Sequence, residues 1–329
     1  MNLVINSEGV YLTRVGECFC LKKEGKKQEI AAKKVEQILI TTSTALSTDA
    51  IELAVENNID IVFLKKYGKP FARVWHSKMG SISTIRRKQL NLQDNEMGTI
   101  LIKEFLTQKI KNQMDHLSQL GMNRRDEERK AIIKEGIEKL RAQMQKIENI
   151  DNKTTINSVR NSIQGYEGTA SRIYFQVLSE LIPEEYKFNG RSKNPAKDEF
   201  NCMLNYGYGI MYSNVEKACI IAGLDPYIGI MHVDNYNRQA FVFDIIEMYR
   251  VYIDKIVFKL CSTKKVKKEH FDDLKGGYYL NKEGKELLIS QYNKDMEQNI
   301  KYKGRNIELQ NIFHYDCHNI ANRILKDGD

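Results

Sequence analysis

The hydrophobic pattern of this sequence changes its period near residue 80, and this change limits the possible folds more than any other feature. Before that point, apolar and β-branched residues come in short runs between polar turns, which is typical of strands. After it, apolar residues recur every three to four positions over long stretches, which is typical of amphipathic helices. The pattern predicts an α+β protein with a small β-rich domain over residues 1–79 and a larger all-helical domain over residues 80–329.

The expected elements follow from this pattern. Strands are expected over residues 2–5, 10–14, 19–22, 37–41, 59–64 and 71–75, with turns at residues 25–27 and 67–70. Ser47-Thr48-Asp49 has the residue types of a helix start. Helices are expected over residues 100–121, 132–147, 157–182, 199–222, 241–260, 282–298 and 307–325.

Charge and composition exclude several classes of protein. The 51 basic and 43 acidic residues give a net charge of +8, which permits a polyanionic partner but does not require one. The six cysteines are scattered and follow no secretory signal, so we expect no disulfide framework. Since no apolar run approaches the roughly 18 residues of a membrane span, we expect a soluble, cytoplasmic protein.

A zinc site near the C-terminus is suggested by His314, Cys317 and His318, which stand at helical spacing. However, an apolar stripe runs through the same segment, and Cys is a common buried residue. We therefore favour a packing role for Cys317 within the stripe formed by Leu309, Phe313, Cys317, Ile320 and Ile324.

One segment places an acidic residue between two glycines, Gly165-Tyr166-Glu167-Gly168, directly before the helical residues 169–175. We expect a helix start here, where the backbone comes close to other groups. The alternative is that Glu167 is a first-turn carboxylate favoured by the helix dipole.

A second segment places Asp244 and Glu247 three residues apart in an apolar helix, so both carboxylates are expected on one face. Burial of an unpaired carboxylate is costly. Either Arg250 neutralises these carboxylates or a metal ion does, and the spacing leaves both possibilities open.

A third segment, residues 223–231, is a loop rich in glycine that leads to His232. A lone histidine there is more often a buried core residue than a ligand. Together with Glu167 and Glu247, however, it completes a donor set of oxygen and nitrogen without a thiolate. This set suits a hard divalent cation, Mg²⁺ or Mn²⁺, which stabilises charge when a phosphodiester is displaced in line.

These segments resemble the CRISPR-associated adaptation integrase and endonuclease family, whose members are the first numbered protein of the CRISPR-associated set. The likeness runs over nearly the whole chain. It is carried by residues 35–40, 45–47, 58–64 and 68–70, and more tightly by Gly165-Tyr166-Glu167-Gly168, Phe188, Arg191, Pro195, Asp198, Asn201, Tyr208, residues 223–229, His232 and residues 244–250. The departures are mild: Asn237 stands where a glycine is common, and Val251 where a proline is common.

The resemblance implies a metal-dependent DNA endonuclease and strand-transfer integrase that inserts short DNA fragments into a CRISPR array. It implies Glu167, His232 and Glu247 as metal ligands, with Asp244 as an auxiliary catalytic group. It also implies a homodimer, joined through the β-rich domains, that assembles with double-stranded DNA and with a small ferredoxin-like dimer, the second CRISPR-associated protein. The candidate DNA contacts are Tyr166, Arg172, Arg191, Lys193, Arg250 and the basic residues 264–268.

Two alternatives come from other functional classes. A non-catalytic DNA-binding scaffold of the same fold would bind DNA without strand transfer. A zinc hydrolase unrelated to nucleic acid is disfavoured, because the sequence has neither a thiolate cluster nor an H-E-x-x-H motif.

Overall fold

The computed structural model describes residues 1–57, 59–65, 70–74, 83–122, 124–193, 195–232, 239–274 and 276–326. The chain forms two compact units, each built from several stretches. The first contains Met1–Met79, Lys193–Ser213 and Val266–Ile312, and the second contains Gly80–Ser192, Asn214–Lys265 and Phe313–Asp329. The predicted domain boundary between residues 79 and 80 lies outside the described residues and stays a prediction.

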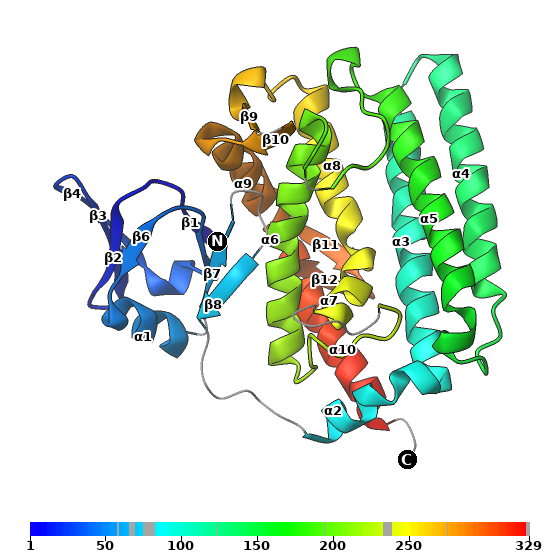
Figure 1. The fold of residues 1–329 in the computed structure, drawn as a ribbon, viewed down its shortest axis with the longest axis horizontal. Coiled ribbons are helices and arrows are strands. Elements are labelled where there is room, and N and C mark those ends of the chain that lie inside the picture. The colour runs from blue at the N-terminus through cyan, green and yellow to red at the C-terminus, as the bar shows by residue number, and fades with distance from the viewer. Residues whose placement is uncertain are drawn as a thin grey trace. The chain divides into compact units, whose positions relative to one another are not determined.

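The N-terminal stretch of the first unit forms two four-stranded sheets (Figure 1). The strands of one sheet are, in spatial order, β1 (Asn2–Ile5), β5 (Gln37–Ile40), β7 (Asp60–Leu64) and β8 (Pro70–Val74). Those of the other are β4 (Lys26–Ala31), β3 (Cys18–Lys23), β2 (Val10–Val15) and β6 (Thr44–Leu46). All residues of β5 are buried, because this apolar strand pairs in parallel with a neighbour on each side, β1 and β7.

Helix α1 (Thr48–Glu56) packs on the hydrophobic core of this N-terminal stretch, and it begins where the sequence predicts. The Ser47 side chain accepts a hydrogen bond from the Ala50 N–H and so caps the helix. Its buried residue Leu53 packs into a core cluster with Leu12, Phe19 and Ile38.

Two short antiparallel hairpins of the first unit interrupt the C-terminal region that we expected to be all helical. They are β9 (Phe271–Leu274) with β10 (Gly277–Leu280), and β11 (Asn299–Tyr302) with β12 (Arg305–Glu308). Four-residue strands are too short to give a clear alternating pattern. The turn signal of the second hairpin is Lys303-Gly304, where both residues have positive φ, as a tight hairpin turn requires. The same unit contains α9 (Lys282–Met296) and the first part of α6 (Glu199–Ile221).

The second unit is helical. Helices α3 (Glu96–Met122), α4 (Glu127–Glu148) and α5 (Ile156–Leu181) lie side by side (Figure 1). The other elements are α2 (Ser83–Leu90), η2 (Leu92–Asp94), η3 (Glu184–Tyr186), the end of α6, α7 (Ala240–Ile245), η4 (Ile246–Met248), α8 (Arg250–Ser262) and α10 (Ile312–Lys326). The predicted fold class, strands followed by a mostly helical region, is confirmed. Within the described residues, no helix is both long enough and apolar enough to cross a membrane.

Two local predictions are wrong. Gly165 and Gly168 lie in the middle of α5 rather than at a helix start, so the helix dipole is not what favours Glu167. The single helix expected over residues 241–260 is instead α7, the 3-10 turn η4 and α8. The chain turns at Tyr249, whose N–H donates to the carbonyl of Ile246.

Candidate metal centre

A buried lysine joins two of the predicted metal-binding carboxylates. Lys109 lies on α3 and is 6% exposed. Its Nζ is 2.6 Å from Oε2 of Glu247 and also pairs with Oε1 of Glu167. Burial alone would lower the pKa of Lys109, but the two carboxylates outweigh it and the pKa is raised. Glu167 and Glu247 therefore share one cation.

Glu247 lies on η4 and forms a second ion pair. Its Oε1 is 3.0 Å from Nη2 of Arg250, as the i, i+3 spacing predicts. Burial raises the pKa of Glu247, but Arg250 and then Lys109 outweigh burial and lower it to about 2. The turn itself is held by Asn112 on α3, whose Nδ2 donates to the carbonyl of Met248 over 2.8 Å.

Glu167 reaches the same place from α5. Its side chain is 23% exposed, and Ser171, one helical turn later, donates a hydrogen bond of 2.7 Å to Oε1. A Cβ placed at Gly165 or Gly168 would meet no atom within 4 Å. Gly165 and Gly168 therefore lie on a bare side of α5, opposite the buried residues Ile163, Ala170 and Tyr174, although a helix interior favours residues other than glycine.

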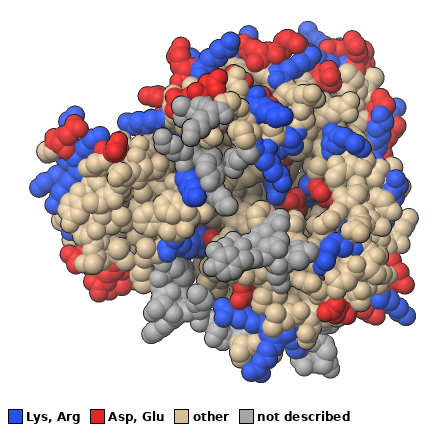
Figure 2. Space-filling model, in the orientation of Figure 1, with Lys and Arg blue, Asp and Glu red and all other residues tan. Residues whose placement is uncertain are grey.

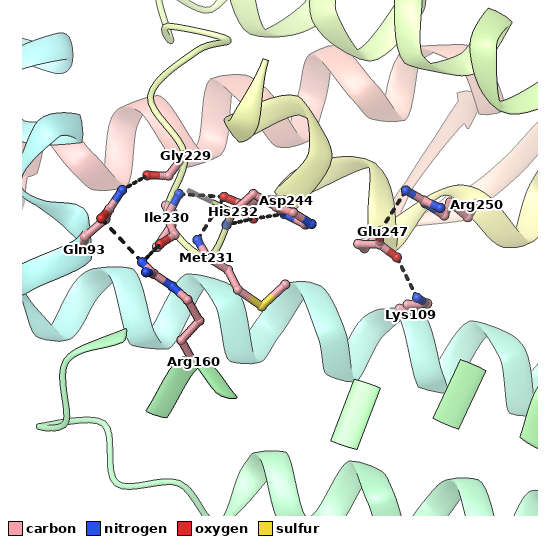
Figure 3. A network of polar contacts seen from close by, with 10 residues as sticks. All are labelled: Gln93, Lys109, Arg160, Gly229, Ile230, Met231, His232, Asp244, Glu247 and Arg250. Atoms are coloured by element: carbon pink, nitrogen blue, oxygen red, sulfur yellow. Dashed lines mark hydrogen bonds and ion pairs between the residues drawn. The ribbon is translucent and has the colours of Figure 1, made fainter. Parts of the chain in front are cut away.

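Asp244 organises the loop that carries His232 (Figure 3). Its Oδ2 accepts the N–H groups of Ile230 and Met231 at 2.6 and 3.1 Å. Its Oδ1 accepts the N–H of His232 at 3.0 Å and shares a hydrogen bond of 2.7 Å with the Nδ1 of the same residue. Asp244 and Glu247 thus contact different partners, and Asp244 orients the imidazole of His232.

Two positions of this loop require glycine for structural reasons. Gly223 ends α6 with a φ of 82°, a left-handed conformation that favours glycine. Gly229 cannot carry a side chain, because a Cβ there would lie 2.4 Å from the carbonyl oxygen of His232 and 2.6 Å from the Cβ of Ala240. These two positions explain why the motif has a glycine at each end.

Two glutamines hold the same loop from the preceding helical segment. Gln89 on α2 is fully buried. Its Nε2 donates hydrogen bonds to the carbonyls of Asp225 and Ile228 at 2.8 and 3.0 Å. Its Oε1 accepts a hydrogen bond from the N–H of Asp225 at 2.9 Å. Gln93 on η2 donates to the carbonyl of Gly229 at 2.9 Å (Figure 3). The position of His232 therefore depends on α2 and η2 as well as on Asp244.

The predicted ligands come together only in part. Glu167 and Glu247 meet at Lys109, and the charge of His232 helps to lower the pKa of Glu247. Across the part of the chain that the structure describes, no group of three or more His, Cys, Asp or Glu residues is arranged as a metal site. Loop residues 233–238, which follow His232, lie outside the described residues.

The sequence patterns do not predict a role for Lys109, Gln89 or Gln93. A signal for Lys109 does exist, because it interrupts the apolar stripe of α3 next to Ile110 and three residues after Leu106. A charged residue at such a position needs a partner of opposite charge. Which carboxylates supply it cannot be read from local spacing.

The C-terminal segment has a packing role. Cys317 is buried and its Sγ lies 3.7 Å from that of Cys219. Burial lowers the pKa of His314 to about 4. These observations agree with the apolar stripe rather than with a zinc site.

The candidate DNA contacts differ in their surroundings. Arg172 is exposed on α5, and Lys193 and the four lysines of residues 264–268 are exposed as well. The Arg191 guanidinium lies 5.4 Å from the ring centre of Phe175, and the Lys146 ammonium lies 5.6 Å from that of Tyr166. Arg250 is committed to Glu247.

Comparison with known proteins places the chain in a family. The profile of the family described as CRISPR associated protein Cas1 matches residues 3–294. The chain belongs to this family. A protein of Archaeoglobus fulgidus named CRISPR-associated endonuclease Cas1 1 is 34% identical over 323 residues, which cover 95% of this chain and 93% of that protein. A second relative, CRISPR-associated endonuclease Cas1 2 of Saccharolobus solfataricus, is 31% identical over 91% of this chain and 86% of its own length.

Solved structures show the same fold. A Cas1 protein from Thermotoga maritima is 20% identical with a TM-score of 0.83, covering 100% of this chain and 98% of that one. A casposase bound to an integration product is 20% identical with a TM-score of 0.81, covering 100% and 91%. A chain of a Cas6-RT-Cas1–Cas2 complex is 21% identical with a TM-score of 0.78, covering 99% of this chain and 35% of that longer one.

Proposed function

We propose that this protein is a metal-dependent DNA integrase and endonuclease of CRISPR adaptation, which inserts short DNA fragments into a CRISPR array. The observation that carries the proposal is the meeting of Glu167 and Glu247 on one cation. The third predicted ligand, His232, has its imidazole oriented by a buried aspartate. The names of the relatives, CRISPR-associated endonucleases, and the likeness to a casposase bound to an integration product support it.

The residues fit a divalent metal ion by their chemistry. Glu167, Glu247 and His232 offer two carboxylates and an imidazole without a thiolate, a set that suits Mg²⁺ or Mn²⁺. The two carboxylates already converge on one positive charge, that of Lys109. When bound there, such an ion supplies Lewis-acid stabilisation of the negative charge that develops on a phosphodiester.

The side chains of the site have distinct roles in this proposal. Asp244 fixes the ring of His232 through Nδ1, which leaves Nε2 as the nitrogen that would bind a metal ion. Arg250 keeps Glu247 ionised, which a metal-binding carboxylate requires. Arg172, which is exposed on the same helix as Glu167, is a candidate for binding DNA phosphates.

The reaction is an in-line displacement at phosphorus. The 3′-hydroxyl of the incoming strand forms a new P–O bond and loses its proton to solvent. The bond from phosphorus to the old 3′-oxygen breaks, and this oxygen takes up a proton from solvent. Water in place of the hydroxyl gives DNA cleavage, and the reverse reaction on branched DNA gives disintegration. A covalent protein intermediate is not needed, so the proposal assigns no nucleophilic side chain.

DNA contacts on this protein are expected to be distributed. Lys and Arg side chains are spread over the face drawn in Figure 2 and are interspersed with Asp and Glu. Binding through such contacts weakens steeply as salt rises. We further propose that the protein assembles with a second CRISPR-associated protein, since a similar chain comes from a Cas6-RT-Cas1–Cas2 complex. A homodimer is proposed from the family resemblance alone.

The test is strand transfer on supercoiled and branched DNA with Mg²⁺, with Mn²⁺ or with chelator. We expect Glu167→Ala and His232→Ala to lose activity by at least about 100-fold while DNA binding persists, and exposed Glu128→Ala on α4 to behave like the wild type. A Glu167→Ala variant as active as the wild type would contradict the proposed site. A wild type that binds DNA but never transfers strands would favour the scaffold alternative.

A further inference from the structure

Lys109 lies between the two carboxylates that we expect to bind the metal ion. Its ammonium contacts one oxygen of each of the two carboxylates that we propose as ligands. The side chain reaches this place from α3, whereas Glu167 and Glu247 come from α5 and η4. We propose that Lys109 is a tethered counterion that occupies the cation position between Glu167 and Glu247 and has to leave it for a divalent metal to bind. This inference rests on the proposed function.

Geometry makes the two cations mutually exclusive. The Lys109 Nζ is 2.6 Å from Oε2 of Glu247 and within hydrogen-bonding distance of Oε1 of Glu167. A magnesium ion keeps its ligand oxygens about 2.0–2.1 Å away. An ion bound to the same two oxygens would overlap the ammonium, so loading requires the lysine side chain to rotate away.

Charge leads to the same conclusion. Glu167 and Glu247 carry two negative charges, and Lys109 and Arg250 carry two positive charges, so these four side chains are already neutral. A divalent ion added to this set would face the repulsion of two cations at close range. Removal of the ammonium from the carboxylates restores an acidic site that attracts the metal.

The lysine also explains how the two carboxylates are stabilised without a metal ion. Glu247 is 6% exposed, and a buried carboxylate without a partner is costly. Two carboxylates held this close favour the binding of a proton unless a cation separates them. A flexible four-carbon stem suits a counterion of this kind, because the charge can move while the helix stays in place.

Solvent can reach the pair from the side of α5. The Glu167 side chain is 23% exposed, whereas that of Glu247 is 8% exposed. A hydrated ion therefore has access to Glu167 before it displaces Lys109 from the more buried Glu247.

The experiment compares Mn²⁺ binding, measured by electron paramagnetic resonance of the free ion, in the wild type, Lys109→Met and Lys103→Met. Lys103 is the matched control, because it lies on the same helix and, among the described residues, donates to two neutral oxygens, those of the Ile150 carbonyl and of the Asn152 side chain. We expect Lys109→Met to bind Mn²⁺ at least about tenfold more tightly than the wild type. Its melting temperature should be lower without metal and rise more on addition of Mn²⁺. Lys103→Met should bind like the wild type.

Equal or weaker Mn²⁺ binding by Lys109→Met overturns the inference. If Lys109→Met does not fold, the wild type decides the question by NMR of selectively ¹³C-labelled lysine, assigned with Lys109→Arg. The Lys109 signal should shift on addition of Mg²⁺, and a signal that stays unchanged while Mg²⁺ binds overturns the inference. If the wild type transfers strands and binds metal but Lys109→Met binds no more tightly, only this inference falls. A wild type that does neither removes the proposed function as well.

Discussion

At the scale of single residues, the site depends on buried charges that are fully hydrogen-bonded. Asp244 is 1% exposed, yet each of its oxygens accepts two hydrogen bonds from residues 230–232. A carboxylate is stable in such a place only while these donors remain aligned. Its structural role is therefore to fix the loop, and through the loop the ring of His232.

The change Asp244→Asn tests this role. The amide has the size of the carboxylate but presents an NH₂ group to backbone N–H donors, so at least one acceptor is lost. We expect the free energy of unfolding, measured by urea denaturation, to fall by about 3 kcal/mol. Asp272→Asn, at an exposed strand position, is the control and should change it little. A loss equal to that of the control would contradict the role.

A second buried residue makes stability depend on pH. His116 on α3 is 3% exposed, shares a 2.7 Å hydrogen bond with Tyr174, and has its pKa lowered to about 3, first by burial and then by Lys255. Between pH 3 and the ordinary histidine pKa of 6.5, the unfolded chain binds a proton that the folded chain does not. Stability is therefore complete above pH 6.5 and falls as the pH drops.

We expect this group alone to cost about 2 kcal/mol between pH 6.5 and pH 5. The free energy of unfolding of His116→Gln should accordingly fall less over this range than that of the wild type. The exposed His318→Gln is the control and should keep the wild-type slope. Parallel curves for the wild type and His116→Gln would show that folding does not lower the pKa of His116.

At the scale of elements, α5 shows where local pattern is informative and where it misleads. The apolar period correctly predicts a helix over residues 157–182. The glycines at 165 and 168 suggest a break, but the helix continues because apolar residues on its other side, among them Ile163, Ala170 and Tyr174, remain buried. Tertiary packing outweighs the low helix propensity of two glycines.

The change Gly168→Ala should therefore stabilise the protein. The added methyl meets open space, and alanine gains about 0.5–1 kcal/mol over glycine in a helix interior. Gly136→Ala in α4 is the contrast, because its Cβ would lie 2.6 Å from Cγ2 of Val177 on α5. We expect that variant to lose about 1–3 kcal/mol. Thermal denaturation of both proteins measures the difference, and a destabilised Gly168→Ala would contradict the open space at this position of α5.

At the scale of the whole molecule, the fold class and the family could be predicted from the sequence, because each motif consists of residues close together in the chain. Residues only a few positions apart in the chain determine several features. These are the strands of the N-terminal sheets, the helix cap at Ser47, and the ion pair between Glu247 and Arg250. The partners of Lys109 are 58 and 138 residues away in the chain. Neither the hydrophobic period nor the residue spacing predicts contacts between residues so far apart in the chain. The ion pairs of Lys109 with Glu167 and Glu247 are therefore seen only in the structure.

The most direct test of the central claim is a crystal structure with Mn²⁺, analysed by anomalous scattering. We predict one anomalous peak coordinated by Glu167, Glu247 and His232, with Asp244 still bound to the imidazole and the Lys109 ammonium displaced. A peak on other residues, or the Lys109 ammonium still between the two carboxylates at saturating Mn²⁺, would contradict the account.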